Sequence, residues 1–204
     1  MKVVAATRNR HKLEEFARIL GPMGCLPVSQ EDVCPGLEVE EDGSTFRENA
    51  RKKAEEIFRR TGMPTIADDS GLCVDALGGA PGVRSARYAD DRGEGHDDKA
   101  NNRKLIQELE GVPMEQRTAR FVCAICFVTE SGEPIECEGV CEGHIAVREQ
   151  GDNGFGYDPL FLVEGGRSFA QLDGEEKDRV SHRGRALREL ERLLKADAER
   201  RDQC

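Results

Sequence analysis

Two adjacent carboxylates, Asp68 and Asp69, follow a short apolar run that begins at Thr65. Acidic residues that leave a strand ahead of a glycine are a common way to hold a hard divalent cation over a phosphate group. Because successive side chains on a strand point to opposite faces, we expect the two aspartates to have different partners. The alternative is a polar hairpin in which both side chains are solvated.

The chain after the carboxylate pair is expected to change direction. Ser70 and Gly71 predict a turn, and residues 72–74 then start a second short strand. Glycines and a proline within residues 78–82 predict a further loop, and Arg84 and Arg87 place positive charge directly after it.

A second candidate site lies near the N-terminus. Residues 2–6 read as a buried strand, and residues 7–12 form a polar, basic segment that leads into a helix with Leu13, Phe16 and Leu20 on one face. The free N–H groups at the start of a helix favour an anion. The segment lacks the glycines of a P-loop, and an ordinary helix cap is the alternative.

The helix expected after residue 45 carries a polar pair at the edge of its apolar face. Thr45 and Glu48 have the spacing of a capping box, and Asn49 and Lys53 lie one turn apart. Such a pair is placed to point into a cleft. The acidic run at residues 38–42, taken alone, is more often a solvated loop than a metal site.

A glycine-rich segment at residues 151–158 surrounds Phe155 and Tyr157. Glycines permit close approach of the backbone, and an aromatic ring there can stack on a planar ligand. A strand is expected at residues 159–163. Ser181 is expected to cap the last helix, which places His182 and Arg183 at a helix N-terminus.

The bulk composition excludes several classes of protein. The net charge of −10 argues against a nucleic-acid-binding protein, which needs a basic face. The first apolar run is too short for a signal peptide or a membrane span, so we expect a cytoplasmic protein without a membrane partner. Most of the eight cysteines are expected to be core residues, and Cys123 and Cys126 would face opposite ways on a strand.

Six motifs in this order resemble the ITPase (Ham1/RdgB-like) family of non-standard purine nucleoside triphosphate pyrophosphatases, from residue 3 to about residue 194. Each motif is weak alone, and the combination is specific. The motifs are Thr7-x-Asn9-x-x-Lys12, Phe46-x-Glu48-Asn49-Ala50-x-x-Lys53, Ala67-Asp68-Asp69-Ser70-Gly71-Leu72, Gly79-Ala80-Pro81-Gly82 with Ser85-Ala86-Arg87-Tyr88, Gly154-Phe155-Gly156-Tyr157-Asp158-Pro159 and Ser181-His182-Arg183.

The resemblance implies an elongated α/β fold built on a long mixed sheet flanked by helices, with two lobes and a central substrate cleft. One domain would cover residues 1–204, with a frayed tail from about residue 195. The resemblance also implies a homodimer, a requirement for Mg²⁺, and hydrolysis of ITP, dITP and XTP to the monophosphate and pyrophosphate.

The resemblance further implies a role for each site residue. The metal would be held by Asp69 with Glu41 or its neighbour Glu40, and Asp69 would also accept the proton of the attacking water. Ser70 would contact the substrate. The triphosphate would be held by Thr7, Arg8, Asn9, Arg10, His11, Lys12, Lys53 and Lys177. The base would be held by Phe155, Gly156, Tyr157, Asp158, His182 and Arg183.

The first loop departs from the family pattern, because Arg8, Arg10 and His11 stand where many relatives have small residues. This loop is therefore expected to bind phosphate more tightly.

Three other functions compete with this reading. A phosphate-binding regulator without catalysis does not need the carboxylate pair, which would repel its ligand unless a metal were bound. A nucleic-acid-binding domain is opposed by the net charge. A Maf-like nucleotide pyrophosphatase acting on pyrimidine or modified nucleotides would be separated by its substrate preference.

Overall fold

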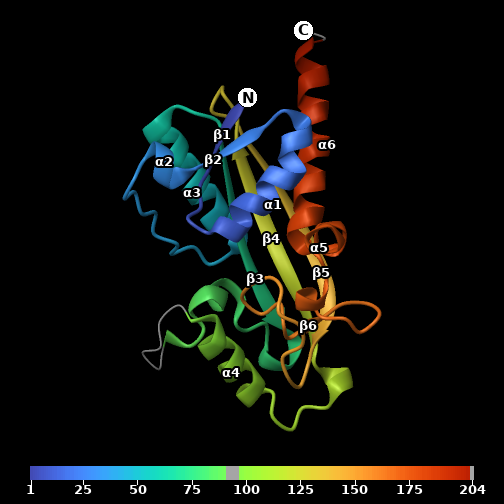
Figure 1. Cartoon of the computed structure of the whole chain (residues 1–204). Coiled ribbons are helices and arrows are strands. Elements are labelled where there is room, and N and C mark those ends of the chain that lie inside the picture. Colours follow the sequence, from blue (N-terminus) through green and yellow to red (C-terminus); the bar gives the residue numbers. More distant parts are fainter. Residues whose placement is uncertain (91–96, 203–204) are drawn as a thin grey trace. The chain divides into compact units, whose positions relative to one another are not determined.

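The computed structural model describes residues 1–90 and 97–202. The chain forms a mixed α/β fold, and its six-stranded sheet has the order β2-β1-β3-β4-β5-β6 (Figure 1). β1 pairs in parallel with β2 and β3, whereas β5 and β6 are antiparallel. The predicted fold class, a mixed sheet flanked by helices, is therefore confirmed.

The elements have the following bounds. The strands are β1 (Lys2–Ala5), β2 (Leu26–Ser29), β3 (Thr65–Val74), β4 (Thr118–Val128), β5 (Pro134–Ile145) and β6 (Phe161–Leu162). The α-helices are α1 (Arg10–Leu20), α2 (Gln30–Val33), α3 (Phe46–Thr61), α4 (Asp98–Glu108), α5 (Gly174–Val180) and α6 (His182–Asp202). Within the described ranges, none of the helices combines the length and the apolar composition needed to cross a membrane.

The chain divides into two compact units. Unit 1 comprises Met1–Asp69, Cys123–Gly139 and Arg183–Cys204, and unit 2 comprises Ser70–Val122 and Val140–His182. The boundaries fall inside β3, β4 and β5, so each of these strands supplies one segment to each unit.

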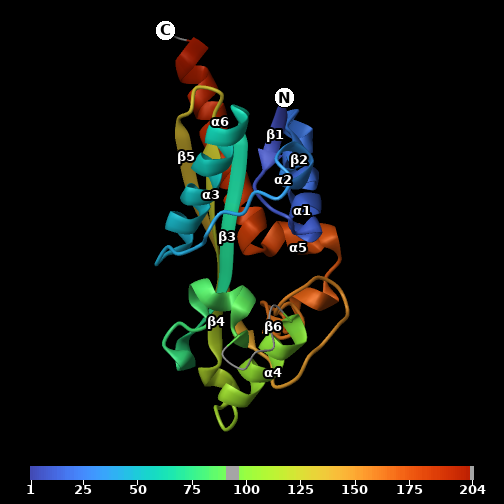
Figure 2. The ribbon, with the colours of Figure 1, turned by 90° about the vertical axis from the view of Figure 1, so that its left-hand side faces the viewer.

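Unit 1 has three layers, with the strands between α3 on one side and α1 and α6 on the other. Alternate residues along the strands pack into the two cores between these layers. Val3 and Ala5 of β1, with Cys123 of β4, pack against α1 and α6. Their neighbours Val4 and Ala6 pack instead against the apolar face of α3. Figure 2 shows α1 and α3 on opposite sides of β3. This alternation follows from the period of two on a strand, and it places the side chains of Asp68 and Asp69 on different faces.

Unit 2 has one core of its own. Leu72 and Val74 of β3 pack with Leu105 and Leu109 of α4, and the rings of its aromatic residues join them. The contributing aromatic residues are Tyr88, Phe121, Tyr157, Phe161 and Phe169.

Two local predictions differ from the structure, and one helix was not predicted. Ser70 and Gly71 do not turn the chain, because β3 continues through them from Thr65 to Val74 between its neighbours β1 and β4. The strand expected at residues 159–163 is reduced to β6. The acidic stretch before Ser181 forms the helix α5, which the sequence pattern did not indicate.

The two ends of the last helix also bear on the predictions. Ser181 separates α5 from α6, so the helix start expected there is confirmed. Residues 195–202 continue α6, and the last two residues of the tail predicted to fray lie outside the described part of the chain.

The predictions for the cysteines hold among the described residues. Five of the seven described cysteines are buried, and no disulfide joins these seven. Cys123 lies in the core that faces α1 and α6, whereas Cys126 lies in the core that faces α3.

Candidate functional site

Asp68 is the centre of a buried ionic network in unit 1. Its Oδ1 atom lies 3.0 Å from Nζ of Lys12, and its Oδ2 atom accepts hydrogen bonds from Nη2 and Nε of Arg183 at 3.0 and 3.2 Å. Nη1 of Arg183 donates to Glu15 of α1. Burial alone lowers the pKa of Arg183, but Asp68 and Glu15 outweigh it and raise the pKa above its usual range. The network therefore places two positively charged side chains, Lys12 and Arg183, against Asp68.

Asp69 has a different set of partners, as the strand geometry predicts. Its Oδ2 atom accepts a hydrogen bond from Nδ2 of Asn49 at 3.0 Å, and its Oδ1 atom lies 3.8 Å from Nζ of Lys53. Burial raises the pKa of Asp69, the ammonium of Lys53 opposes this shift, and the negative charge of Glu41 adds to it. Asn49 and Lys53, the polar pair one turn apart on α3, thus both point at Asp69.

The acidic run meets this centre at Glu41. Nζ of Lys53 donates to Glu41 at 2.6 Å and to the backbone carbonyl of Asp68 at 2.8 Å. Leu37 and Val39 pack against the core that faces α3, whereas residues 38 and 40, which alternate with them, are exposed. Because an extended segment alternates its side chains, Glu41 follows the inward side.

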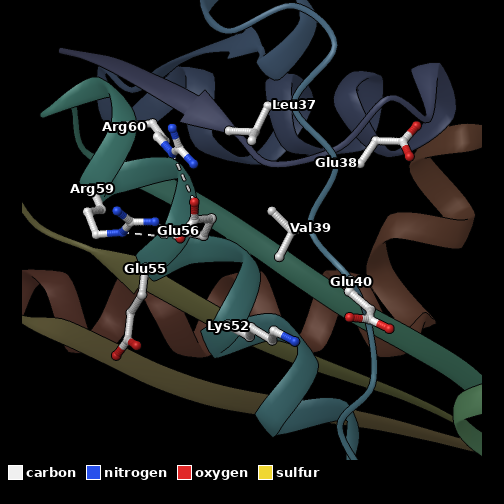
Figure 3. Close-up of a pocket in the computed structure, with 9 residues that line it drawn as sticks. All are labelled: Leu37, Glu38, Val39, Glu40, Lys52, Glu55, Glu56, Arg59 and Arg60. Atoms are coloured by element: carbon white, nitrogen blue, oxygen red, sulfur yellow. Dashed lines mark hydrogen bonds and ion pairs between the residues drawn. The ribbon is translucent and has the colours of Figure 1, made fainter.

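Glu40 lies elsewhere in unit 1. It lines an open pocket of about 480 Å³ between the segment 37–40 and α3, together with Lys52 and Glu56 (Figure 3). Glu56 in this pocket is already paired with Arg59 and Arg60. Of the two candidate metal ligands, only Glu41 shares the ammonium of Lys53 with Asp69.

Glu41 and Asp69 could supply part of the coordination shell of a hard cation, with a bound phosphate group and water supplying the rest. Glu41 and Asp69 offer oxygen atoms 2.6 and 3.8 Å from one ammonium. No group of three or more histidine, cysteine or acidic residues that could hold a metal occurs in the part of the chain that the structure describes. Mg²⁺ keeps several waters and is commonly held by one or two carboxylates plus substrate phosphates, so this donor set suits it.

The loop before α1 is ordered by its own side chains. Oδ1 of Asn9 caps α1 by accepting hydrogen bonds from the backbone N–H groups of His11 and Lys12, and Oγ1 of Thr7 accepts one from Asn9. The alternative of a helix cap is therefore realised. In addition, the ammonium of Lys12 forms an ion pair with Asp68, and this contact is not part of the helix cap.

The extra basic residues of this loop are engaged with carboxylates. Arg8 contacts Glu38 at 2.8 Å and Glu31 at 3.2 Å, and Arg10 contacts Glu14 at 3.3 Å. These pairs lie on the surface, where an ion pair is easily exchanged for another partner.

The glycine-rich segment forms a closed loop in unit 2. Oδ2 of Asp158 accepts hydrogen bonds from the backbone N–H of Phe155 at 2.9 Å and from Nζ of Lys177 at 2.6 Å. The same ammonium lies 4.9 Å from the centre of the Phe155 ring. A Cβ atom at Gly154 would lie 2.0 Å from Oδ2 of Asp158, so the loop can close only around a glycine.

The last two predicted base contacts, His182 and Arg183, belong to different units. The ring of His182 stacks on Phe121 with 4.6 Å between centroids, and it lies 6.3 Å from Phe169. Arg183 belongs to unit 1 and contacts Asp68 there. Ser70 is half-buried at the start of the unit 2 segment of β3.

The remaining predicted base-site residues, Gly156 and Tyr157, are anchored within unit 2. The Tyr157 side chain is buried in the core, and its hydroxyl donates to the carbonyl of Ser85 at 2.8 Å. The backbone N–H of Gly156 donates to Asp98 at 2.7 Å.

Two contributors were missed by the sequence reasoning. Glu15 could have been noticed as a charge next to Phe16, on the buried side of an amphipathic helix. Phe121 gave no signal, because an aromatic residue on a buried strand is ordinary.

The chain is similar to known proteins along almost its whole length. A sequence model of the Ham1 family matches residues 3–193. The chain is 51% identical over 195 residues to a dITP/XTP pyrophosphatase of Desulforamulus reducens, covering 95% of this chain and 96% of the relative. It is 52% identical over 187 residues to one of Geobacter sulfurreducens, covering 91% and 92%. The structure of the Staphylococcus aureus Ham1 protein superposes with a TM-score of 0.85 at 39% identity, covering 97% and 100%.

Proposed function

The chain belongs to the Ham1 family, and on that premise we propose that it hydrolyses the non-canonical purine nucleoside triphosphates dITP, ITP and XTP to the monophosphate and pyrophosphate. The observation that carries the proposal is the pair of carboxylates, Glu41 and Asp69, directed at one buried ammonium. A phosphate-binding protein without catalysis has no use for this charge.

In the proposed reaction, water attacks the α-phosphorus and the bond to the α–β bridging oxygen breaks, so that pyrophosphate leaves. Asp69 accepts the proton of the water, and its raised pKa makes it a better base than an ordinary aspartate. Glu41 and Asp69 would hold Mg²⁺, which supplies positive charge for the phosphate oxygens.

The phosphates are assigned to unit 1. Lys12 and Lys53 each lie beside a carboxylate, and these ion pairs order their side chains. Both are assigned to the oxygens of the triphosphate, and at the start of α1 Arg10 adds positive charge and His11 adds a polar ring.

The purine is assigned to unit 2. The Phe155 ring offers a stacking surface, while the partner of Lys177 in this loop is Asp158. Among the four backbone N–H groups of the segment 155–158, that of Tyr157 alone has no hydrogen-bond partner within the described residues. It is a candidate donor to the 6-oxo group of hypoxanthine or xanthine, which adenine lacks.

Arg183 is better supported as a residue that positions Asp68 than as a direct contact to the base. Three of its donor bonds go to Asp68 and Glu15. Its contact with the purine, the homodimer and the cytoplasmic location stay predictions from the sequence.

A panel of substrates tests the proposal. ITP, dITP, XTP, GTP, ATP and a pyrimidine triphosphate are compared by the release of pyrophosphate and, separately, of orthophosphate. We expect kcat/KM for ITP and XTP to exceed that for ATP by about 100-fold or more. The 6-amino group of adenine would face a hydrogen-bond donor, and burying a polar group without a partner costs free energy. Equal turnover of ATP and ITP, or release of orthophosphate, would contradict the proposal. A preference for pyrimidines would favour the Maf-like alternative.

A further inference from the structure

Helix α4 buries an unusual set of side chains for a surface helix of unit 2. Asn101, Asn102 and Lys104 are 2, 3 and 9% exposed, although an amphipathic helix normally buries apolar residues. Buried polar groups need hydrogen-bond partners. On α4 these partners belong mainly to the backbone of two loops, residues 85–89 and the glycine-rich segment.

Asn101 holds the first of these loops. Its Oδ1 atom accepts a hydrogen bond from the N–H of Ala89 at 2.8 Å, and its Nδ2 atom donates to the carbonyl of Ala86 at 3.2 Å. The carbonyl of Ser85 receives both Nδ2 of Asn101, at 3.4 Å, and the hydroxyl of Tyr157, at 2.8 Å. The two loops are therefore joined at one carbonyl beneath α4.

Asp98 and Asn102 hold the second loop by hydrogen bonds to the N–H and the carbonyl of Gly156. Oδ2 of Asp98 accepts a hydrogen bond from the N–H of Gly156 at 2.7 Å, and Nδ2 of Asn102 donates to the carbonyl of Gly156 at 3.2 Å. Gly156 has a φ of 61°, a conformation that favours glycine. Both polar groups of this residue, which lies between Phe155 and Tyr157, are thus fixed by one helix.

The orientation of the Asn102 amide is fixed by the two acceptors around its nitrogen. Its Nδ2 atom also donates to Oε1 of Glu149 at 2.8 Å, so both neighbours of that nitrogen are oxygen acceptors. Rotating the amide would place its oxygen against them. As a result, Oδ1 of Asn102 is buried without a hydrogen-bond partner among the residues described. An unpaired buried acceptor of this kind calls for an explanation.

We propose that Asp98 and Asn102 are positioning residues for recognition of the purine base. By holding Gly156 at both its N–H and its carbonyl, they set the direction of the Phe155 ring and leave the N–H of Tyr157 to the substrate. The inference rests on the proposed function, which assigns this loop to the base. Neither residue touches the substrate.

This role predicts a loss of affinity only for ligands that carry the purine base. Lys12 and Lys53, to which the phosphates are assigned, are in unit 1 with Glu41 and Asp69. Lys177 of unit 2 pairs with Asp158, which neither Asp98 nor Asn102 contacts through Gly156. Loosening the Gly156 peptide should therefore weaken binding of ITP and IMP and leave binding of inorganic tripolyphosphate unchanged. A merely structural role would weaken binding of all three ligands together.

The test compares Asp98→Ala with Asp98→Asn, in which the amide oxygen can still accept the Gly156 N–H. Asn102→Ala removes the other contact, and Lys99→Ala is a matched control on an exposed position of the same turn. KM and kcat are measured with ITP, and inhibition constants with IMP and with tripolyphosphate. Thermal melting of each variant is followed in parallel.

We expect Asp98→Ala and Asn102→Ala to raise KM for ITP and the inhibition constant of IMP by about 10-fold, with kcat within about 3-fold. Asp98→Asn and Lys99→Ala should stay near the parent, and tripolyphosphate should inhibit all variants alike. Asp98 is exposed, so its pair of variants decides the question even if Asn102→Ala fails to fold.

Two results would overturn the inference: parental KM values in Asp98→Ala, or a parallel weakening of tripolyphosphate. Failure of the proposed function is distinct, because it shows in the parent enzyme as equal use of ITP and ATP.

Discussion

The choice between Glu40 and Glu41 as metal ligand can be tested with two isosteric substitutions. Glu41→Gln and Glu40→Gln each remove one negative charge from adjacent positions of the same extended segment. Glu41 reaches the ammonium that also faces Asp69, whereas Glu40 lines the open pocket beside α3 (Figure 3). We therefore expect only Glu41→Gln to weaken the binding of Mg²⁺.

The size of the effect follows from the surroundings of Glu41. Two unit charges 4 Å apart interact by about 4 kcal/mol at an effective dielectric constant of 20 and by about 1 kcal/mol in bulk water. The Glu41 side chain is 40% exposed, which places it between these limits. A loss of about 2 kcal/mol corresponds to about 30-fold weaker binding of Mg²⁺. The exposed Glu40 should cost less than about threefold, because solvent and salt screen its charge.

The assay is release of pyrophosphate from saturating ITP as Mg²⁺ is titrated. Glu41→Gln should need about 30-fold more Mg²⁺ for half-maximal rate and should recover part of its kcat at high Mg²⁺. Melting temperatures measured alongside check that Lys53, which keeps its bond to the Asp68 carbonyl, has not destabilised α3. A shift in Glu40→Gln with none in Glu41→Gln would refute the assignment.

Four further predictions concern single side chains and one pair of thiols. Asp69→Asn should lower kcat for ITP by roughly 100-fold or more with the fold retained, and near-parental kcat at saturating Mg²⁺ would contradict its role as base. Lys12→Ala should lower kcat/KM and change the free energy of unfolding by no more than about 1 kcal/mol, because Asp68 keeps Arg183. Lys177→Ala should cost about 3 kcal/mol or more, since it removes the positive charge beside the buried carboxylate of Asp158, and equal melting temperatures of these two variants would contradict the difference. Burial raises the pKa of Cys126 and that of Cys137 to about 12, so the folded state keeps both protons while the unfolded thiols ionise. Stability should then fall as pH rises above about 9, by about 1.4 kcal/mol per thiol between pH 8 and pH 10, and a Cys126→Ala/Cys137→Ala variant should lose that part of the pH dependence in denaturant titrations.

Local patterns in the sequence predicted much of unit 1. The apolar spacing of α1 and α3, the Thr45 cap and the alternation of Asp68 with Asp69 all agree with the structure. These features depend on residues a few positions apart, so the period of the element decides them.

Local patterns failed where pairing or packing overrides propensity. Ser70 and Gly71 favour a turn, but the neighbouring strands hold them extended within β3. Helix α5 was missed because it is short and mostly charged, and its Asp173 cap satisfies the backbone of Glu176. Neither outcome is visible without the neighbours that supply the hydrogen bonds.

The sequence by itself determined the residue types, their order and hence the family, because six spaced motifs survive without coordinates. Tertiary structure alone decided which of two chemically identical carboxylates meets Lys53. Glu40 and Glu41 differ only in the direction of their side chains, and that direction is set by the packing of Leu37 and Val39 against the core under α3. An ion pair between distant segments exists only where the packing of the apolar neighbours brings the two charges together.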